Sequence, residues 1–416
     1  MKIGAGRVQI TPDVGMELSG FLARQQPSTS VLDPLFAKAL FIEHEGQRLL
    51  WLHADILGFD RPFVARFREW VAEHLQVRAD HILLSATHTH SGPTQYELIN
   101  CGRRDAKYVE ILFERMTTVA KWAADLVEPA KLVTAVDQLS LAIDRRKKAS
   151  AHTDPRVTGV GFRRADGTFI AAILNYAMHP VALGARNRAI SADWCGHAAA
   201  RAAEILPGNP IVLMTNGAAG NINPPSENVS VDQVRTWGYA VADAIAPKLA
   251  HASADEPALA VRSCDVLMPL EIWNESQIDA AAQKQIGAVK LPEGWGARYV
   301  DAIRTWQHNR KAALAHGVKD KTEIEIQVVR LGPLTFVTAA GEFFSRYADL
   351  IREESGKDVH IIGYANGNFG YVATSAAYDE GGYEIDSAHF FYNTFRARRG
   401  AFEQLARDAG KLVRQL

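Results

Sequence analysis

Short apolar runs of strand length alternate along the chain with longer stretches in which apolar residues recur every three or four positions. The clearest runs lie at 37–43, 48–56, 81–86 and 210–215. Continuous apolar runs of this length are typical of buried β-strands. Because helical patterns separate them, the chain is predicted to be α/β, with mixed β-sheets layered with helices.

Helical periodicity is clearest in the stretch 61–76, which follows the second apolar run. Its apolar residues form one stripe, made by Phe63, Phe67, Trp70, Val71 and Leu75. Similar patterns predict further helices near 106–126, 196–206, 231–249 and 388–414.

The region from about 270 to 320 is polar and helical, although the chain around it is rich in strands. A surface helix pair is the simplest interpretation, and a helical insertion or lid over a site is the alternative. No internal repeat, low-complexity tract or Ser/Gly linker divides the sequence. We therefore expect residues 1–416 to form a single domain.

Composition and charge narrow the classes of partner. Apolar residues make up 47% of the chain and charged residues 22%, which is ordinary for a globular protein with a sizeable core. With 46 basic and 47 acidic residues, the formal charge is -1, so no overall field attracts nucleic acid or an anionic membrane. No apolar run reaches the roughly 18 residues of a membrane span, and the first residues lack a signal-peptide core. We expect a cytoplasmic protein with no nucleic-acid partner and no stable membrane insertion; a homo-oligomer stays open.

Cysteine is not the expected metal ligand of this chain. Cys101, Cys195 and Cys264 lie far apart, with no CxxC spacing. This argues against a disulfide framework or a cysteine zinc site. Any metal would use His, Asp, Glu or Tyr.

Two histidines follow the third apolar run directly, in the stretch ATHTHSGP at 86–93. Side chains two positions apart on a strand point to the same face, so His88 and His90 are expected to face one site. In open α/β sheets, ligands bind beyond the ends of the strands. The pair therefore indicates either a metal site or two hydrogen-bonded loop histidines.

Two further candidate ligands follow other predicted strands. His179 comes after FIAAILNYA and is followed by Pro180, which restricts the backbone before it. Glu342 comes after LTFVTA, with Gly341 at the turn. A carboxylate at a helix start is also favoured by the helix dipole, which is the alternative for Glu342. Two histidines and a glutamate match a catalytic zinc set that leaves one position for water.

A glycine-rich segment near the C-terminus carries several tyrosines. They are Tyr364, Tyr371, Tyr378 and Tyr383, set among small polar residues. Buried tyrosines often anchor packing through a hydrogen-bonded hydroxyl. Because no amphipathic stripe accompanies them, we expect these four to form a pocket wall.

Taken in order, five segments resemble the neutral/alkaline non-lysosomal ceramidase family. They are ATHTHSGP, NYAMHP, TNGAAGNINPP, AAGEF, and YANGNFGYVAT followed by AAYDEGGYE. The likeness begins near DPLFAKALF and covers most of the chain. It looks like the family's catalytic domain without its additional C-terminal β-sandwich domain.

The resemblance implies an α/β catalytic domain with one zinc ion per chain. The ligands it implies are His88, His179, Glu342 and Tyr371. It further implies that His90 acts on the bound water or the substrate oxygen. Arg145 and Tyr383 are the matches for the family's oxyanion-stabilising residues, and Arg146 is the alternative to Arg145.

One departure from the family pattern changes the expected mechanism. Many ceramidases carry a GDVSP-like segment with a serine proposed to act in catalysis, whereas this chain reads GNINP and has Asn223 there. A metal-activated water is then the expected nucleophile, and Asn221 or Asn223 shapes the site. His90, whose unperturbed pKa is near neutral, is the candidate for proton transfer to the amine. Asp55 and Asp193 are either carboxylates that orient a ligand histidine or ordinary cap and turn residues.

The function predicted from these residues is zinc-dependent hydrolysis of an N-acyl amide bond. The expected partner is a small-molecule N-acylated substrate, smaller or more soluble than ceramide, although ceramide itself stays open. The alternatives are a zinc-dependent esterase or lactonase, and a non-catalytic metal-binding scaffold.

Overall fold

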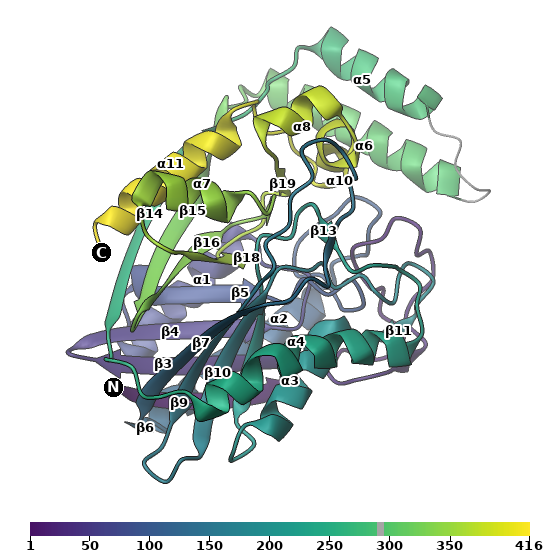
Figure 1. Cartoon of the computed structure of the whole chain (residues 1–416). Coiled ribbons are helices and arrows are strands. Elements are labelled where there is room, and N and C mark those ends of the chain that lie inside the picture. The colour runs from purple at the N-terminus through teal and green to yellow at the C-terminus, as the bar shows by residue number, and fades with distance from the viewer. Residues whose placement is uncertain (289–294) are drawn as a thin grey trace.

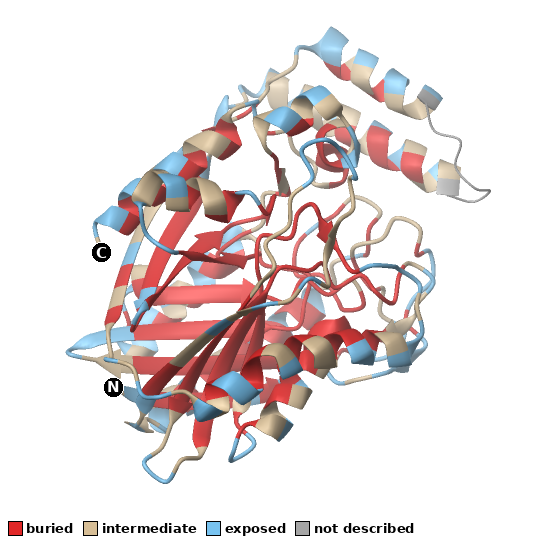
Figure 2. Cartoon of the chain, viewed as in Figure 1, coloured by how far each residue is buried: buried red, intermediate tan, exposed pale blue. Residues whose placement is uncertain are grey.

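The structure is a computed structural model that describes residues 1–288 and 295–416. Three sheets of four or five strands form its centre, and helices cover their outer faces (Figure 1). Most strands are buried, whereas the outward faces of the helices are exposed (Figure 2). The predicted class, mixed β-sheets layered with helices, is confirmed.

The first sheet has the strand order β5–β4–β3–β1–β6. Its strands are β1 (Lys2–Gln9), β3 (Phe36–His44), β4 (Gln47–Ala54), β5 (Ile82–Ala86) and β6 (Glu128–Pro129), with a short 3-10 turn (Ala79–His81) before β5. The helices packed with it are α1 (Arg61–Leu75) and α2 (Ala106–Asp125). Each begins where an aspartate, Asp60 or Asp105, accepts a hydrogen bond from a backbone N–H of the first turn.

The second sheet has the order β12–β10–β9–β7. Its strands are β7 (Lys131–Gln138), β9 (Arg156–Arg163), β10 (Phe169–Tyr176) and β12 (Ile211–Asn216). It is covered by α3 (Asp193–Ile205) and α4 (Val231–His251).

The third sheet has the order β14–β15–β16–β18. Its strands are β14 (Leu259–Pro269), β15 (Lys321–Leu331), β16 (Leu334–Ala339) and β18 (His360–Gly363). The helices against it are α7 (Tyr347–Ser355) and α11 (Ala401–Arg414).

The three sheets meet in a shared apolar core. Trp51 of the first sheet, Ile173 of the second and Phe336 of the third belong to one buried cluster, in which the Trp51 and Phe336 rings lie 5.9 Å apart edge to face. Each sheet also contains a parallel pair: β4 with β5, β10 with β12, and β16 with β18. Because β5, β12 and β18 contact one another, the segments that follow these strands are brought to one place.

Short strand pairs join the loops beyond the sheets. They are β2 (Ser30–Val31) with β11 (Ala189–Ile190), β8 (Ile143–Asp144) with β13 (Ile222–Asn223), and β17 (Glu342–Phe343) with β19 (Tyr371–Val372). The last two pairs lie in the segments that the sequence motifs single out.

The polar region near 270–320 contains two helices, α5 (Glu275–Ala288) and α6 (Trp295–Ala315), which pack against each other. Residues 289–294, within the same predicted region, lie outside the described residues. The Trp306 indole on α6 donates a 2.8 Å hydrogen bond to the carbonyl of Thr394. The helix pair is therefore packed on the segment that carries three short helices, α8 (Ser375–Glu380), α9 (Tyr383–Asp386) and α10 (Ala388–Phe391). Its action as a lid, and the single-domain assignment, stay predictions.

The prediction of one continuous helix at 388–414 is wrong for the middle of that range. Helix α10 ends at Phe391, and α11 begins only after Gly400, whose φ is +91°. Between them, Arg396 forms an ion pair with Glu271 and the chain pairs with the segment after β14. These tertiary contacts replace the helical hydrogen bonds that local periodicity predicts.

Among the described residues, no helix is both long enough and apolar enough to span a membrane.

Candidate metal centre

His88 is positioned by a left-handed backbone turn rather than by strand geometry. Strand β5 ends at Ala86, and His88 has φ +66°, which is uncommon for a residue with a Cβ. Its ring stacks on Tyr364 at 3.8 Å between centroids, and its Nδ1 lies 2.6 Å from the carbonyl oxygen of Leu57. The two histidines do meet, as predicted, but the turn at His88 and not strand alternation brings them together.

Hydrogen bonds fix both the ring and the main chain of His179. Its Nδ1 lies 2.8 Å from the carbonyl oxygen of Ala219, and its own carbonyl accepts a hydrogen bond from the Trp194 indole. Its backbone N–H donates to Ile222. The GAAGN segment after β12 therefore orients this histidine.

Glu342 lies in β17 and is therefore not a helix-start carboxylate. Its register partner in the parallel strand β19 is Tyr371, so the backbone places the two predicted ligands side by side. Gly220 allows the neighbouring loop to approach, since a Cβ there would lie 2.4 Å from the Glu342 carbonyl oxygen. The hydroxyl of Tyr392 donates a hydrogen bond to Glu342 Oε1.

Three side chains from three different sheets converge at this point. Glu342 Oε2 lies 3.7 Å from His88 Nε2 and 3.2 Å from His179 Nε2. Ligand atoms bound to zinc at 2.0–2.1 Å with tetrahedral angles lie roughly 3.3 Å apart. Both distances from Glu342 Oε2 are thus near the separation of two ligands on one ion, and the ligand atoms of His88 and His179 lie within 4.8 Å of each other.

The protonation pattern also fits a cation. An Nδ1 that faces a backbone carbonyl must carry the proton, so in the neutral rings of His88 and His179 the Nε2 atoms present lone pairs. Glu342 Oε2 is buried and has no hydrogen-bond donor among the described residues. Two imidazole lone pairs and a carboxylate oxygen that face one another in a buried site are a donor set that fits a bound cation.

The charges of the site follow from its burial and its neighbours. Burial acts to raise the pKa of Glu342, but hydrogen bonding and the positive charges that His179 and His88 carry when protonated outweigh this effect and lower it to about 2. Burial lowers the pKa of His88 to about 3. An ionised carboxylate and a neutral imidazole can bind a metal without first losing a proton.

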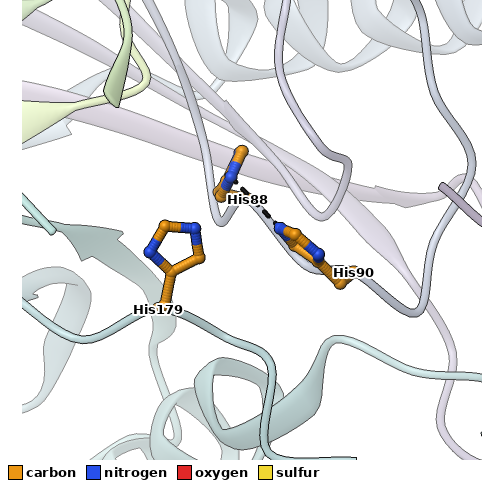
Figure 3. Close-up of side chains that lie close together, drawn as sticks. All are labelled: His88, His90 and His179. Carbon is orange, nitrogen blue, oxygen red and sulfur yellow. Dashed lines mark hydrogen bonds between the residues drawn. The ribbon is translucent and has the colours of Figure 1, made fainter. Parts of the chain in front are cut away.

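His90 lies at the same site, as Figure 3 shows, with His88 and His179 around one space. Its Nε2 is 3.3 Å from His88 Nε2, so the three histidines by themselves form a group that can hold a metal. Burial lowers the pKa of His90 well below its usual range. The expectation of a near-neutral pKa for this residue is therefore wrong, because the ring is surrounded by protein.

The backbone of residues 20–24 encloses His90. Gly20 has φ +93°, and a Cβ there would lie 2.3 Å from His90 Nδ1. The Phe21 ring meets His90 edge-on at 4.8 Å, and Arg24 donates to the His90 carbonyl at 2.6 Å. The sequence analysis did not find this wall because no motif marks it.

Arg145 and Tyr371 form the side of the site opposite these loops. The Arg145 guanidinium donates to the Tyr371 hydroxyl at 3.0 Å, to Asn223 Oδ1 at 3.0 Å and to Glu384 at 2.9 Å. Burial raises the pKa of Tyr371 well above its usual value near 10, so the phenol is protonated until a cation replaces its proton. The Tyr383 ring meets Tyr371 edge-on at 5.6 Å and is 47% exposed.

Arg146, the alternative to Arg145, points elsewhere. It is nearly buried and forms ion pairs with Glu384 and Glu380. Only Arg145 contacts Tyr371, so of the two arginines Arg145 belongs to the predicted group.

Neither Asp55 nor Asp193 contacts a candidate ligand histidine. Asp55 accepts from the backbone of Phe36, and Asp193 accepts from the backbones of Leu183 and Trp194. The hypothesis that they orient the histidines is wrong, because backbone carbonyls occupy both Nδ1 positions. The carboxylates act as the ordinary turn residues of the alternative interpretation.

The two asparagines differ in their contacts. Asn221 binds Asp144, His152 and Ser345 and so ties together the loops behind the site. Asn223 contacts Arg145 and therefore reaches the site itself.

The four tyrosines of the glycine-rich segment lie in different environments. Tyr378 donates to the carbonyl of Ala397 and anchors packing, which corrects its assignment to the pocket wall. Tyr364 is buried behind His88. Tyr371 and Tyr383 line cavities next to the site.

Tyr392 and Glu384 are functional candidates that the sequence analysis missed. Tyr392 lies in AHFFYNTF, an apolar stretch that has the pattern of core residues. Glu384 was part of the recognised AAYDEGGYE segment, but its pairing with two arginines depends on a loop more than 200 residues away.

Comparison with solved structures gives the class of fold. The neutral ceramidase from Pseudomonas aeruginosa matches with a TM-score of 0.75 and 19% sequence identity, over 100% of this chain and 74% of that one. A ceramidase complexed with C2 matches with a TM-score of 0.76 and 18% identity, over 100% of this chain and 75% of that one. The protein thus has the neutral ceramidase fold.

Sequence comparison finds neutral ceramidases that are similar to part of this chain. The neutral ceramidase of Drosophila melanogaster is 26% identical over 227 residues, which are 48% of this chain and 31% of that protein. The neutral ceramidase of Pseudomonas aeruginosa is 25% identical over 222 residues, 47% of this chain and 32% of that protein. The matches therefore span about a third of the length of these curated relatives. No protein-family model matches the sequence. The resemblance inferred from the motifs is confirmed as similarity to neutral ceramidases over about half of the chain.

Proposed function

We propose that the protein is a zinc-dependent hydrolase that cleaves an N-acyl amide bond. The observation that carries the proposal is the position of Glu342 Oε2, 3.7 Å from His88 Nε2 and 3.2 Å from His179 Nε2, with no hydrogen-bond donor to it among the described residues. The similarity to neutral ceramidases supports the reaction class. Tyr371, the register partner of Glu342, is the proposed fourth ligand.

Zinc is the ion that this donor set favours, because two imidazoles and a carboxylate form a known catalytic zinc set. When bound, zinc lowers the pKa of a water from about 15.7 to about 7 and polarises the carbonyl oxygen that faces it.

The chain's own groups supply the remaining parts of the reaction. Arg145 and Tyr383 are proposed to donate hydrogen bonds to the oxygen that becomes negative as water attacks the acyl carbon. His90 presents Nε2 to the same space, 3.3 Å from His88 Nε2, so it is the group proposed to transfer a proton to the departing amine.

The proposed function is tested by elemental analysis followed by an activity screen. The screen uses N-acyl amides of graded chain length, each with the matched ester. We expect about one zinc per chain and hydrolysis of at least one amide. Cleavage of esters alone would favour the esterase or lactonase alternative, and full zinc occupancy without any turnover would favour a non-catalytic scaffold.

Replacing Tyr383 by phenylalanine should slow turnover while zinc stays bound. The hydroxyl is proposed to stabilise the oxyanion, and losing one such donor raises the barrier by about 2.7–4 kcal/mol, or roughly 100-fold or more in kcat. The measurement is kcat together with zinc content. An unchanged kcat removes Tyr383 from the mechanism.

Replacing Tyr392 by phenylalanine should weaken zinc binding. Its hydroxyl donates a hydrogen bond to Glu342 Oε1, so that Oε2 faces the histidines. Loss of an outer partner of a metal ligand typically lowers metal affinity about 10- to 100-fold. The affinity is measured by competition with a chromogenic chelator, and Y378F is the control because it removes a tyrosine hydroxyl that binds Ala397. Equal affinities of Y392F and Y378F would contradict the prediction.

A further inference from the structure

A cavity of about 330 Å³ adjoins the proposed catalytic site. Arg145 and Tyr383, the two proposed oxyanion donors, form part of its wall. Since Arg145 also binds the Tyr371 hydroxyl, the cavity is one side chain away from the candidate metal ligands. The cavity is thus within reach of one of the two halves of a substrate whose amide lies at the metal centre.

The wall of this cavity is built mainly from residues with polar end groups, whose apolar stems form part of its surface. Apart from Tyr383 and two glycines, its side chains are charged or carry an amide. A hydrocarbon chain placed here would remove these groups from water without replacing their hydrogen bonds, which is unfavourable. The half of the substrate that enters the cavity is thus polar rather than an alkyl chain.

The charges on the wall leave cationic donors in excess. The carboxylate of Glu384 is shared between Arg145 and Arg146, and Glu227 accepts from the amide of Asn223. Arg146 Nε is buried and has no acceptor among the described residues. Lys148 is exposed at the cavity and has no ion pair within the described part of the chain. The carboxylates are therefore already bound, while the Lys148 ammonium remains for a ligand.

From this arrangement we propose that the substrate carries a carboxylate close to the scissile amide, as in an N-acyl amino acid. The carboxylate binds at the Lys148 side of the cavity, where the ammonium is the available donor. This inference rests on the proposed amide hydrolysis and names the substrate class of that site.

The test compares N-acylglycines with the matched N-acylglycinamides, which differ only in the charge of the terminal group. We expect kcat/KM to be up to about fivefold higher for the acid, a ratio that falls as salt is added, because a partly exposed ion pair contributes up to about 1 kcal/mol and is screened. K148E should remove or invert this preference, with a much smaller effect on the rate for the glycinamide than on the rate for the acid. The control is K147E, because Lys147 is an equally exposed neighbour outside the cavity wall.

The outcomes separate the two proposals. Equal rates for acid and amide in the wild type would overturn the carboxylate assignment while amide hydrolysis stands. Equal effects of K148E and K147E would also overturn it, because they would indicate general attraction by surface charge.

A binding measurement covers the case in which no N-acyl compound is cleaved and the proposed function fails. Calorimetry then compares binding of N-acetylglycine and N-acetylglycinamide to wild type and K148E. Preferential binding of the acid that K148E abolishes supports the cavity's selectivity, and its absence overturns it.

Discussion

Replacing either His88 or His179 by alanine is expected to abolish both zinc binding and hydrolysis. Each substitution removes an Nε2 atom whose position is set by a backbone carbonyl, at Leu57 or Ala219, and no other described side chain takes that position. Without the ion a water keeps its high pKa, so kcat/KM should fall more than about 1,000-fold, equivalent to over about 4 kcal/mol of barrier. The measurements are zinc per chain by elemental analysis and kcat/KM on the best amide.

The control for this pair is H74A. His74 lies at the exposed end of α1, stacked on Trp70, and faces no candidate ligand. It should keep full zinc content and activity. Full zinc content in H88A and H179A, with both variants folded by circular dichroism, would remove these residues from the metal site.

His90 is tested in the same series. The proposal assigns it to proton transfer, whereas its distance of 3.3 Å from His88 Nε2 is also that of a ligand. H90Q should therefore keep zinc and lose roughly 100-fold to 10,000-fold in kcat. Loss of zinc from H90Q would make the metal centre a three-histidine site.

Chelation of the wild-type protein should inactivate it and lower its melting temperature, and added zinc should restore both. The stability effect follows from the site itself, because a cation that binds the buried carboxylate and the two histidine lone pairs binds only the folded state. An ion present at 1,000 times its Kd stabilises the folded state by about 4 kcal/mol. The measurement is thermal unfolding with and without chelator, in parallel with activity.

The matched control for chelation is the H179A variant. Because it lacks a ligand, its melting temperature should not respond to chelator or to zinc. Full activity of wild-type protein that elemental analysis shows to be free of metal would refute hydrolysis by a zinc-activated water.

Most helices and strands could be predicted because their signals are local. The stripe through Phe63, Phe67 and Val71 specified α1, and the runs before His88 and His179 specified β5 and β10. Where the local signal was overridden, as at 392–400, contacts with the segment after β14 were responsible.

The sequence predicted the candidate metal ligands but not the groups that hold them in place. His88, His179, Glu342 and Tyr371 were marked by residue type and motif, and the structure brings Glu342 to within 3.7 Å of both histidines. The groups that hold them were not found, because a backbone carbonyl or a tyrosine such as Tyr392 carries no motif that distinguishes it from the core.

The sequence by itself determined the class of fold, the residue types of the candidate metal ligands and the resemblance to neutral ceramidases. These features depend on residue identity and on periodicity along the chain. Only the tertiary structure decided that loops from three sheets meet at one point, that β17 pairs Glu342 with Tyr371, and that Tyr392 occupies one oxygen of the carboxylate. It also decided that the adjoining cavity is charged. The physical reason is that side chains far apart in sequence are brought together by long-range strand pairing and a shared apolar core, which no local pattern encodes.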